Sequence, residues 1–315
     1  MPAQPSVSDV RPVDPVLTNL SIAFKNDRFL HEELAPFSRV EQKSGTFFVY
    51  TRDFWMRRMN GAVRGEGNRY LRVGHGVSTD TYETVERGFE KALDDPTKAA
   101  SLTPESLETV DLQYLTNIMQ LDLEKRAAAA LFITGVWGTS TTLAGGNQWS
   151  DYANSDPIAN ADTARNTIKR NTGAVPNKLF MGVSAWQKLR EHPLVLDKYK
   201  YTQIGVITPE LVAPVMQVES ITVGDSVENT AAEGATYVGA DIWTDNALFV
   251  VKGNPGLGVL SGAFNLIWPE AGAYPWAVQQ YRDEPVRSDV QRIFNHNVYK
   301  VVAAQAGYIY LDAIA

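Results

Sequence analysis

The spacing of apolar residues predicts one long helix before the midpoint of the chain. Apolar side chains recur every three or four residues over residues 103–132, which places them on one stripe of an amphipathic helix (Leu107, Val110, Tyr114, Ile118 and Leu121). Thr103 is the expected N-cap, and Pro104 suits the first helical position. At 1.5 Å per residue, such a helix should be on the order of 40 Å long.

A second pattern predicts a long β-hairpin before this helix. Residues 46–51 and 77–85 are rich in strand-forming side chains, and the segment between them is rich in glycine and arginine. From residue 51 to residue 75, six arginines stand against two acids, so this window carries 6 − 2 = +4 in a chain of net charge −7. A loop of this length without its own core is more often functional or partner-bound than idle, and a solvated loop is the alternative.

The chain before the hairpin and the chain after the helix have different patterns. Residues 1–43 predict an extended arm, because five prolines block long helices, and such an arm needs a partner surface to be buried. After residue 145, short helices and strands alternate. Helix starts are expected at Asp156, Ser184 and Thr208. Strands are expected at residues 178–181, 220–223, 247–251, 264–268, 276–281, 298–302 and 308–311. The fold class is therefore α+β with mixed sheets.

Composition narrows the class of protein. The 315 residues are 44% hydrophobic and 21% charged, as in ordinary folded proteins, and length alone would allow one large domain or two. The absence of cysteine excludes disulfides and thiolate metal sites and suits a reducing bacterial cytoplasm. The longest apolar run, residues 127–136, is about half of what a membrane span needs. The acidic balance argues mildly against wrapping nucleic acid by bulk attraction.

No catalytic, cofactor-binding or metal site is predicted. The four histidines, at positions 31, 75, 192 and 296, are isolated in the sequence, and none belongs to a metal-ligand spacing. Ser184 follows an expected strand as a hydrolase nucleophile would, but Trp186 stands where that motif needs glycine, so an N-cap explains the serine better. A hydrolase using Ser184 or a pair of carboxylates remains the rival hypothesis from the enzyme class.

Several short segments, taken in order, resemble a known family. They are residues 13–19, 35–37, 40–48, 155–158, 175–182, 186–193, 198–201, 207–211, 218–225 and 241–248, and the stretch VPNKLFMG at 175–182 is the most characteristic. In order and spacing, they resemble the major capsid proteins of tailed bacteriophages, which have the Hong Kong 97-type fold. The resemblance implies an N-terminal arm (1–43), an extended β-hairpin loop (44–90), a peripheral domain with a spine helix (91–144), an axial domain (145–290) and return strands of the peripheral domain (291–315).

The same resemblance implies a structural protein rather than an enzyme. The subunit would self-assemble into pentamers and hexamers in the host cytoplasm and become part of the virion. The shell would enclose double-stranded DNA without sequence-specific binding. Because the chain begins directly with the arm, a separate scaffolding protein is expected, together with a portal protein; a decoration protein is left open. An encapsulin-type bacterial compartment shares the fold and is the alternative, although the order of arm and loop favours a phage.

Two expectations concern contacts between subunits. Some relatives cross-link their shells through a lysine of the extended loop, but residues 44–90 contain no lysine, so this chemistry is expected to be absent. The loop arginines are expected to dock on acidic surface of an adjacent subunit, because guanidinium groups bind carboxylates through two points. The expected contact residues are Arg57, Arg58, Arg64, Arg69 and Arg72 of the loop and Glu105, Glu108 and Asp111 of the long helix.

Overall fold

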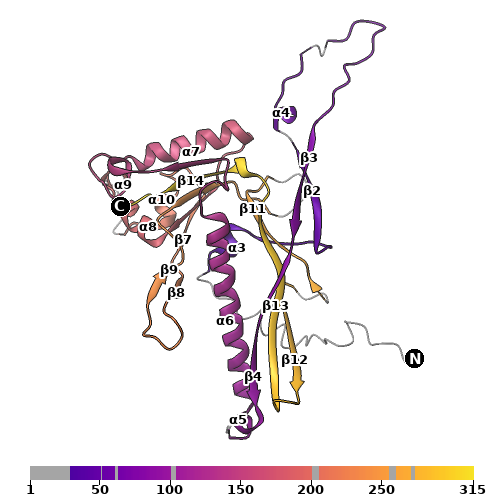
Figure 1. Cartoon of the computed structure of the whole chain (residues 1–315). Coiled ribbons are helices and arrows are strands. Elements are labelled where there is room, and N and C mark those ends of the chain that lie inside the picture. The colour runs from indigo at the N-terminus through magenta and orange to yellow at the C-terminus, as the bar shows by residue number, and fades with distance from the viewer. Residues whose placement is uncertain are drawn as a thin grey trace.

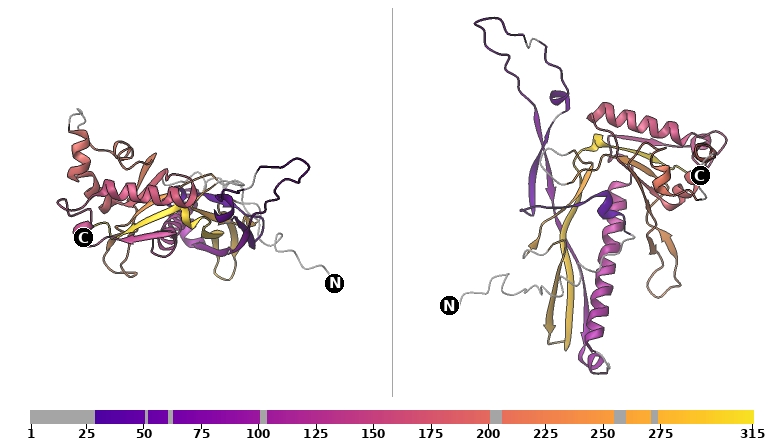
Figure 2. Two further views of the ribbon diagram at one scale, coloured as in Figure 1. Left: turned by 90° about the horizontal axis from the view of Figure 1, so that it is seen from above. Right: turned by 180° about the vertical axis from the view of Figure 1, so that it is seen from behind.

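A computed structural model of the chain describes residues 29–50, 52–60, 63–100, 104–200, 206–254, 260–270 and 274–315. Its elements form a compact lobe and an elongated lobe, and a long hairpin projects from the region where the two meet (Figure 1). The views from above and from behind show that the molecule is much thinner in one direction than in the other two (Figure 2). None of the described helices is long and apolar enough to cross a membrane.

The compact lobe is built on a five-stranded sheet. Its strands, in spatial order, are β5 (Thr139–Thr142), β14 (Gly307–Leu311), β10 (Ala247–Val250), β6 (Lys178–Gly182) and β7 (Ser220–Gly224). Alternate side chains of a strand point to opposite faces. Leu179 and Phe249 therefore pack with the helices of the lobe, whereas Phe180 and Leu248 pack in a second cluster on the other face. Those helices are α7 (Pro157–Thr172), α8 (Val183–Arg190), α9 (Pro193–Tyr199) and α10 (Pro209–Val212).

The starts of these helices test the expected caps. The Asp156 side chain accepts a hydrogen bond from the Ala159 amide at 2.9 Å, which confirms the predicted start of α7. Thr208 does precede α10, but its side chain caps no backbone amide. The expectation for Ser184 is wrong, because Gly182 is the N-cap of α8 and Ser184 lies inside its first turn. A Cβ atom at Gly182 would come within 2.3 Å of the Thr244 carbonyl oxygen, so a close approach of two backbones fixes where the strand ends and the helix begins.

The elongated lobe consists of the long helix α6 (Pro104–Leu131) packed against a second sheet. The 14-residue strand β13 (Ser288–Val301) is the centre of this sheet. Along one edge, β13 pairs with β4 (Val85–Asp94). Along its other edge, it pairs first with β12 (Ala277–Asp283) and then with β11 (Ala263–Ile267). Strand β11 in turn pairs with β1 (Phe37–Arg39). The short helix α5 (Asp95–Ala100) joins β4 to α6.

The existence of the long helix is confirmed, but the face predicted to be buried is wrong. Val110 and Tyr114 of the expected stripe are 56% and 55% exposed. The helix instead buries a second apolar stripe, Leu112, Leu115, Met119 and Leu123, which packs on Trp276, Val278 and Ile293. Both stripes keep a spacing of three or four residues, so the sequence alone allows either face to be buried. The position of the sheet decides between them.

The last turns of α6 belong to both lobes. Ala127 and Leu131 join the cluster that covers the second face of the compact sheet, and this cluster also contains Leu30 and Leu34 from the segment around α3 (His31–Leu34). Residues 29–39, which were expected to belong to an extended arm, are therefore packed on their own chain. Residues 1–28 lie outside the described residues, as does the expected N-cap Thr103.

The predicted long hairpin is confirmed. Strand β2 (Ser44–Tyr50) pairs antiparallel with β3 (Val77–Glu83), from Ser44 opposite Glu83 to Tyr50 opposite Val77. A second, shorter hairpin, β8 (Val227–Asn229) and β9 (Gly239–Asp241), hangs below the compact lobe beside α6 (Figure 1). The remaining short elements are α4 (Arg52–Trp55), η1 (Gly145–Asn147) and η3 (Ala304–Ala306).

Candidate interaction surfaces

The loop between β2 and β3, residues 52–76, extends far from the body of the chain (Figures 1 and 2). Its apolar side chains are exposed to a degree that is unusual for residues of this size. Val63 is 94% exposed and Tyr70 is 73% exposed, and Met56, Met59, Leu71 and Val73 are between 38% and 64% exposed. Contact between water and apolar surface of this kind is unfavourable, and such surface is typical of interaction sites.

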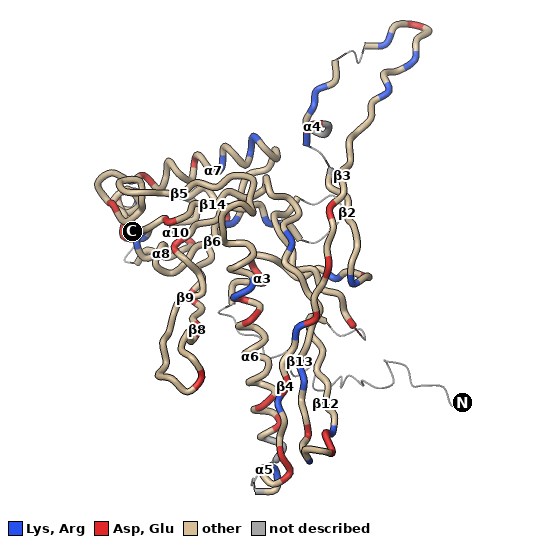
Figure 3. The backbone as a smooth tube through the Cα atoms, viewed as in Figure 1, with Lys and Arg blue, Asp and Glu red and all other residues tan. Residues whose placement is uncertain are grey.

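The arginines of this loop are arranged along the same exposed segment (Figure 3). Arg64 is used locally: its Nε donates to the Asn68 carbonyl at 2.6 Å, and its guanidinium lies 4.8 Å from the centre of the Tyr70 ring. Arg57, Arg58, Arg69 and Arg72 are exposed and form no ion pair with any described residue. At the base of the loop, Arg52 donates to Asn171 of α7 at 3.0 Å, so this end of the loop is held against the compact lobe.

The acids expected to receive these arginines already have partners within the chain. Lys98 binds Glu108 at 2.5 Å, and Lys91 binds Asp111, whose side chain is only 10% exposed. Glu105 lies in the first turn of α6, and its side chain is outside the described residues. These lysines make Glu108 and Asp111 poorer acceptors for a further arginine than their sequence positions suggest.

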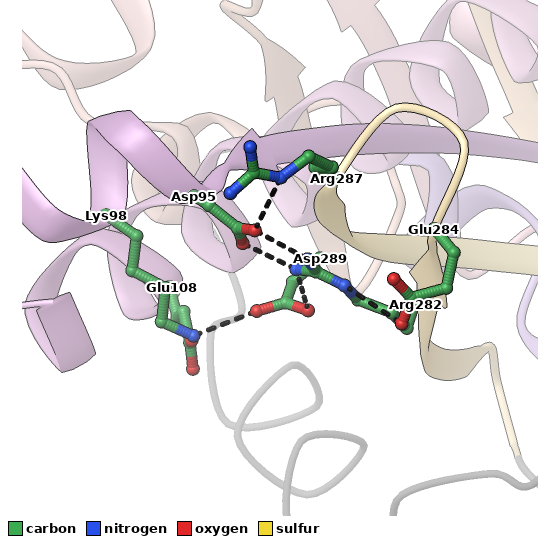
Figure 4. A network of polar contacts seen from close by, with 7 residues as sticks. All are labelled: Asp95, Lys98, Glu108, Arg282, Glu284, Arg287 and Asp289. Atoms are coloured by element: carbon green, nitrogen blue, oxygen red, sulfur yellow. Dashed lines mark hydrogen bonds and ion pairs between the residues drawn. The ribbon is translucent and has the colours of Figure 1, made fainter.

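Glu108 belongs to an ion network at the far end of the elongated lobe (Figure 4). Arg282 binds both carboxylate oxygens of Asp95 at 2.6 Å and reaches Asp289 at 3.1 Å, while Lys98 binds Asp289 at 3.0 Å. The hydrogen bond from Lys98, followed by the bond from Arg282, holds the pKa of Asp289 below its ordinary value. The network ties the start of α6 to the turn between β12 and β13.

A buried carboxylate, Glu124 of α6, holds together three segments where the lobes meet. Its Oε1 accepts from the Leu30 amide at 2.8 Å, from Ser226 Oγ at 2.9 Å and from Trp243 Nε1 at 2.6 Å, and its Oε2 accepts from the His31 amide at 2.8 Å. Burial raises the pKa of Glu124, and the four donors oppose this effect. No ion pair with Lys, Arg or His is found for it among the described residues, so its role is to organise backbone and side-chain donors.

One serine and one histidine lie as close together as a catalytic nucleophile and its general base. Ser155 Oγ lies 3.0 Å from Nε2 of the fully buried His192. His192 Nδ1, however, accepts a hydrogen bond from the Leu194 amide at 3.3 Å, so the ring proton is on Nε2. His192 must then donate to Ser155, which donates onward to the Asp151 carbonyl at 2.7 Å. The imidazole has no lone pair facing the serine and cannot act as its base.

Comparisons with known proteins identify the family of the chain. Residues 98–263 match the sequence profile described as phage major capsid protein E. The chain is 29% identical to the major capsid protein of Burkholderia phage BcepMu over 248 residues, which are 76% of each protein.

Solved structures show the same fold. A phage-related protein from Bordetella bronchiseptica RB50 is 22% identical with a TM-score of 0.77, over 96% of this chain and 98% of that one. A subunit of the mature capsid of bacteriophage PhiM1 is 12% identical with a TM-score of 0.56, over 91% and 87% of the two chains. The α+β fold is thus that of Hong Kong 97-type capsid structures.

The family match covers more than half of the chain, and it decides between the hypotheses that the sequence left open. It favours a phage shell over a bacterial compartment, and a structural component of the virion over a hydrolase. The chain belongs to the phage major capsid protein E family and is the major capsid protein of a tailed-phage head.

Proposed function

We propose that the loop of residues 52–76 clamps an adjacent subunit in the shell. The observation that carries this proposal is the combination of six large exposed apolar side chains with four exposed arginines that have no ion-pair partner in the described chain. Apolar area supplies the association energy, and the guanidinium groups give direction and charge complementarity to an acidic protein. The hairpin β2–β3 carries the loop to its neighbour, since paired strands hold their direction better than a single extended chain.

We further propose subdomain boundaries that follow the sheets. The loop subdomain is 44–83, the peripheral subdomain combines 85–131 with 263–301, and the axial subdomain combines 139–250 with 307–315. The boundaries expected at residues 90 and 290 fall inside β4 and β13, two strands that pair with each other over ten residue positions. Compact axial subdomains would meet around the centre of pentamers and hexamers.

The acceptors on the neighbouring subunit are acidic side chains. Glu105, Glu108 and Asp111 remain the first set to test, although the last two would have to share their carboxylates with Lys98 and Lys91. A separate scaffolding protein, a portal protein and a decoration protein are further expected partners. DNA would be enclosed without sequence-specific contacts, which suits a subunit of net charge −7.

Limited trypsin digestion tests the clamp directly. Free subunits should be cut first within the arginine-rich loop, whereas intact shells should resist cleavage there because a neighbour covers it. Equal rates of loop cleavage in subunits and shells would contradict the proposal.

Charge reversal tests the arginines separately from the apolar contacts. The double variant Arg57→Glu/Arg69→Glu should fold normally but give shells that dissociate at lower salt than the parent. Each exposed pair contributes only about 0–1 kcal/mol, but it is repeated in every subunit. The control variant Arg170→Glu/Arg190→Glu makes the same charge change on exposed positions of α7 and α8. Shells of the loop variant that are as salt-resistant as the parent would show that its arginines are merely solvated.

A further inference from the structure

We infer that Glu86, Glu270 and His296 form a binding site for a divalent transition-metal ion of the Zn²⁺ type. Among the described residues, they are the one group of three such side chains whose ligand atoms all lie within 4.8 Å of one another. The three residues are widely separated along the chain, so no local sequence pattern reveals the group. The inference does not depend on the clamp proposed for the loop.

The sheet register brings the three side chains together. Glu86 of β4 lies directly opposite His296 of β13, so the two side chains share one face of the sheet. On the other edge of β13, the Trp268 amide donates to the His296 carbonyl at 3.0 Å. Glu270, two residues further along, reaches back to His296. The site therefore lies where the edge partner of β13 changes from β12 to β11.

The imidazole is held in a fixed orientation. His296 is 3% exposed, and its ring lies edge-on at 4.9 Å from the ring of Trp268 and at 6.4 Å from that of Phe294. Its Nε2 points to both carboxylates, at 2.8 Å from Glu270 and 3.9 Å from Glu86. Nδ1 has no hydrogen-bond partner in the described structure, so packing and Glu270 orient the ring. A buried, oriented imidazole aimed at two acids is a prepared ligand rather than an accidental neighbour.

The charges of the group favour a cation. Neither Glu86 nor Glu270 has a lysine or arginine within 4.0 Å among the described residues, so two carboxylates face each other across one imidazole. Their side chains are 49% and 27% exposed, which leaves a path for an ion and for water ligands. A bound dication would neutralise both acids.

The donor set selects the type of metal. Imidazole nitrogen with carboxylate oxygen suits Zn²⁺ and its neighbours, whereas Mg²⁺ and Ca²⁺ prefer oxygen alone. With metal–ligand bonds near 2.0–2.2 Å, ligand atoms of a tetrahedral site lie about 3.3–3.6 Å apart. The observed separations of 2.8 and 3.9 Å bracket this range, and small rotations of the two partly exposed glutamate side chains would close the difference.

Such an ion would act as a structural clasp. It would tie β4, β13 and the segment after β11 together on one face of the central sheet of the elongated lobe. Metal binding should therefore raise the melting temperature of the protein, because a ligand that binds the folded chain alone stabilises it.

The test uses the full-length protein after treatment with a chelator and gel filtration. Zn²⁺ is titrated by calorimetry, and retained metal is measured by mass spectrometry. We expect saturable binding near one Zn²⁺ per chain and a higher melting temperature with Zn²⁺. Glu86→Gln and Glu270→Gln should each weaken binding by at least about tenfold and reduce the thermal shift. Glu233→Gln, which removes an exposed carboxylate from the β8–β9 connection, should behave like the parent.

Three results would overturn the inference. They are the absence of saturable Zn²⁺ binding by the parent, unchanged affinity in the Glu86→Gln/Glu270→Gln double variant, and an equal loss of affinity in the Glu233→Gln control. In each case the contact between His296 and Glu270 would be an ordinary hydrogen bond. Both glutamates are partly exposed, so their glutamine variants should fold, and circular dichroism would verify this before titration.

Discussion

Replacing Glu124 by glutamine should destabilise the subunit more than any other single change of one carboxylate on α6. The carboxylate is completely buried and accepts four hydrogen bonds from the segment near α3, from Ser226 and from Trp243. Glutamine keeps the shape and one acceptor oxygen but replaces the other oxygen by an amino group. That amino group would face a backbone N–H, most simply the amide of His31.

The magnitude follows from these four contacts. Hydrogen bonds to a charged group contribute about 1.5–3 kcal/mol, against about 0.5–1.5 kcal/mol for neutral pairs, so three retained bonds lose roughly 3 kcal/mol together. A donor left without an acceptor costs about 1–3 kcal/mol more. A neutral glutamine avoids the cost of burying a charge, which offsets several kcal/mol of the lost stability. The net loss should be about 2–3 kcal/mol, or roughly 3–5 °C in melting temperature for a chain of this length.

Thermal unfolding of soluble subunits measures the effect, with tryptophan fluorescence as the signal because Trp243 is one of the donors. Asp122→Asn is the matched control on the same helix. It makes the same charge change, but Asp122 forms a partly buried pair with Arg126 of the next turn at 2.7 Å, so its loss should cost only about 1 kcal/mol. If Glu124→Gln melts within 1 °C of that control, the four hydrogen bonds do not hold the lobes together as described.

Three further predictions concern acid stability, packing and covalent chemistry. Asp289→Asn should lower the melting temperature at pH 7. Because the folded pKa of Asp289 is depressed, this difference should begin to shrink as the pH falls below about 4, and a difference that stays undiminished as the solution is acidified further would contradict the assignment. Gly307→Ala should cost about 1–3 kcal/mol in urea unfolding, because its Cβ would lie 2.0 Å from Trp137 Cε3, whereas Gly74→Ala, with nothing within 4 Å, should be nearly neutral. Shells boiled in denaturant should run as one band near 34.8 kDa, because residues 44–90 contain no lysine, and a ladder of multimers would reveal a cross-link elsewhere.

The elements that the sequence determined by itself are those that depend on neighbours along the chain. The long helix, the pairing of β2 with β3 and the start of α7 at Asp156 all follow from residue spacing, strand propensity and cap chemistry within a short window. The resemblance in ordered segments also identified the family correctly.

Tertiary structure decided which surfaces meet. The sequence of α6 contains two apolar stripes of equal periodicity, and only the position of the second sheet leaves Val110 and Tyr114 exposed and buries Leu112 and Leu115. Strand β13 pairs with β4, which lies about 200 residues earlier in the sequence. Domain boundaries placed at residues 90 and 290 therefore cut through one sheet.

The same reason explains the polar sites. Lys98 and Glu108 are close in sequence, but Asp289, the second acid that Lys98 binds, is 191 residues from Lys98. His296 gains Glu86 from a neighbouring strand and Glu270 from a connection, and Glu124 gains donors from segments about 93 to 119 residues away. Periodicity specifies which face of an element is apolar or polar. The partner of that face depends on packing between segments that are distant in sequence, so no local pattern can predict it.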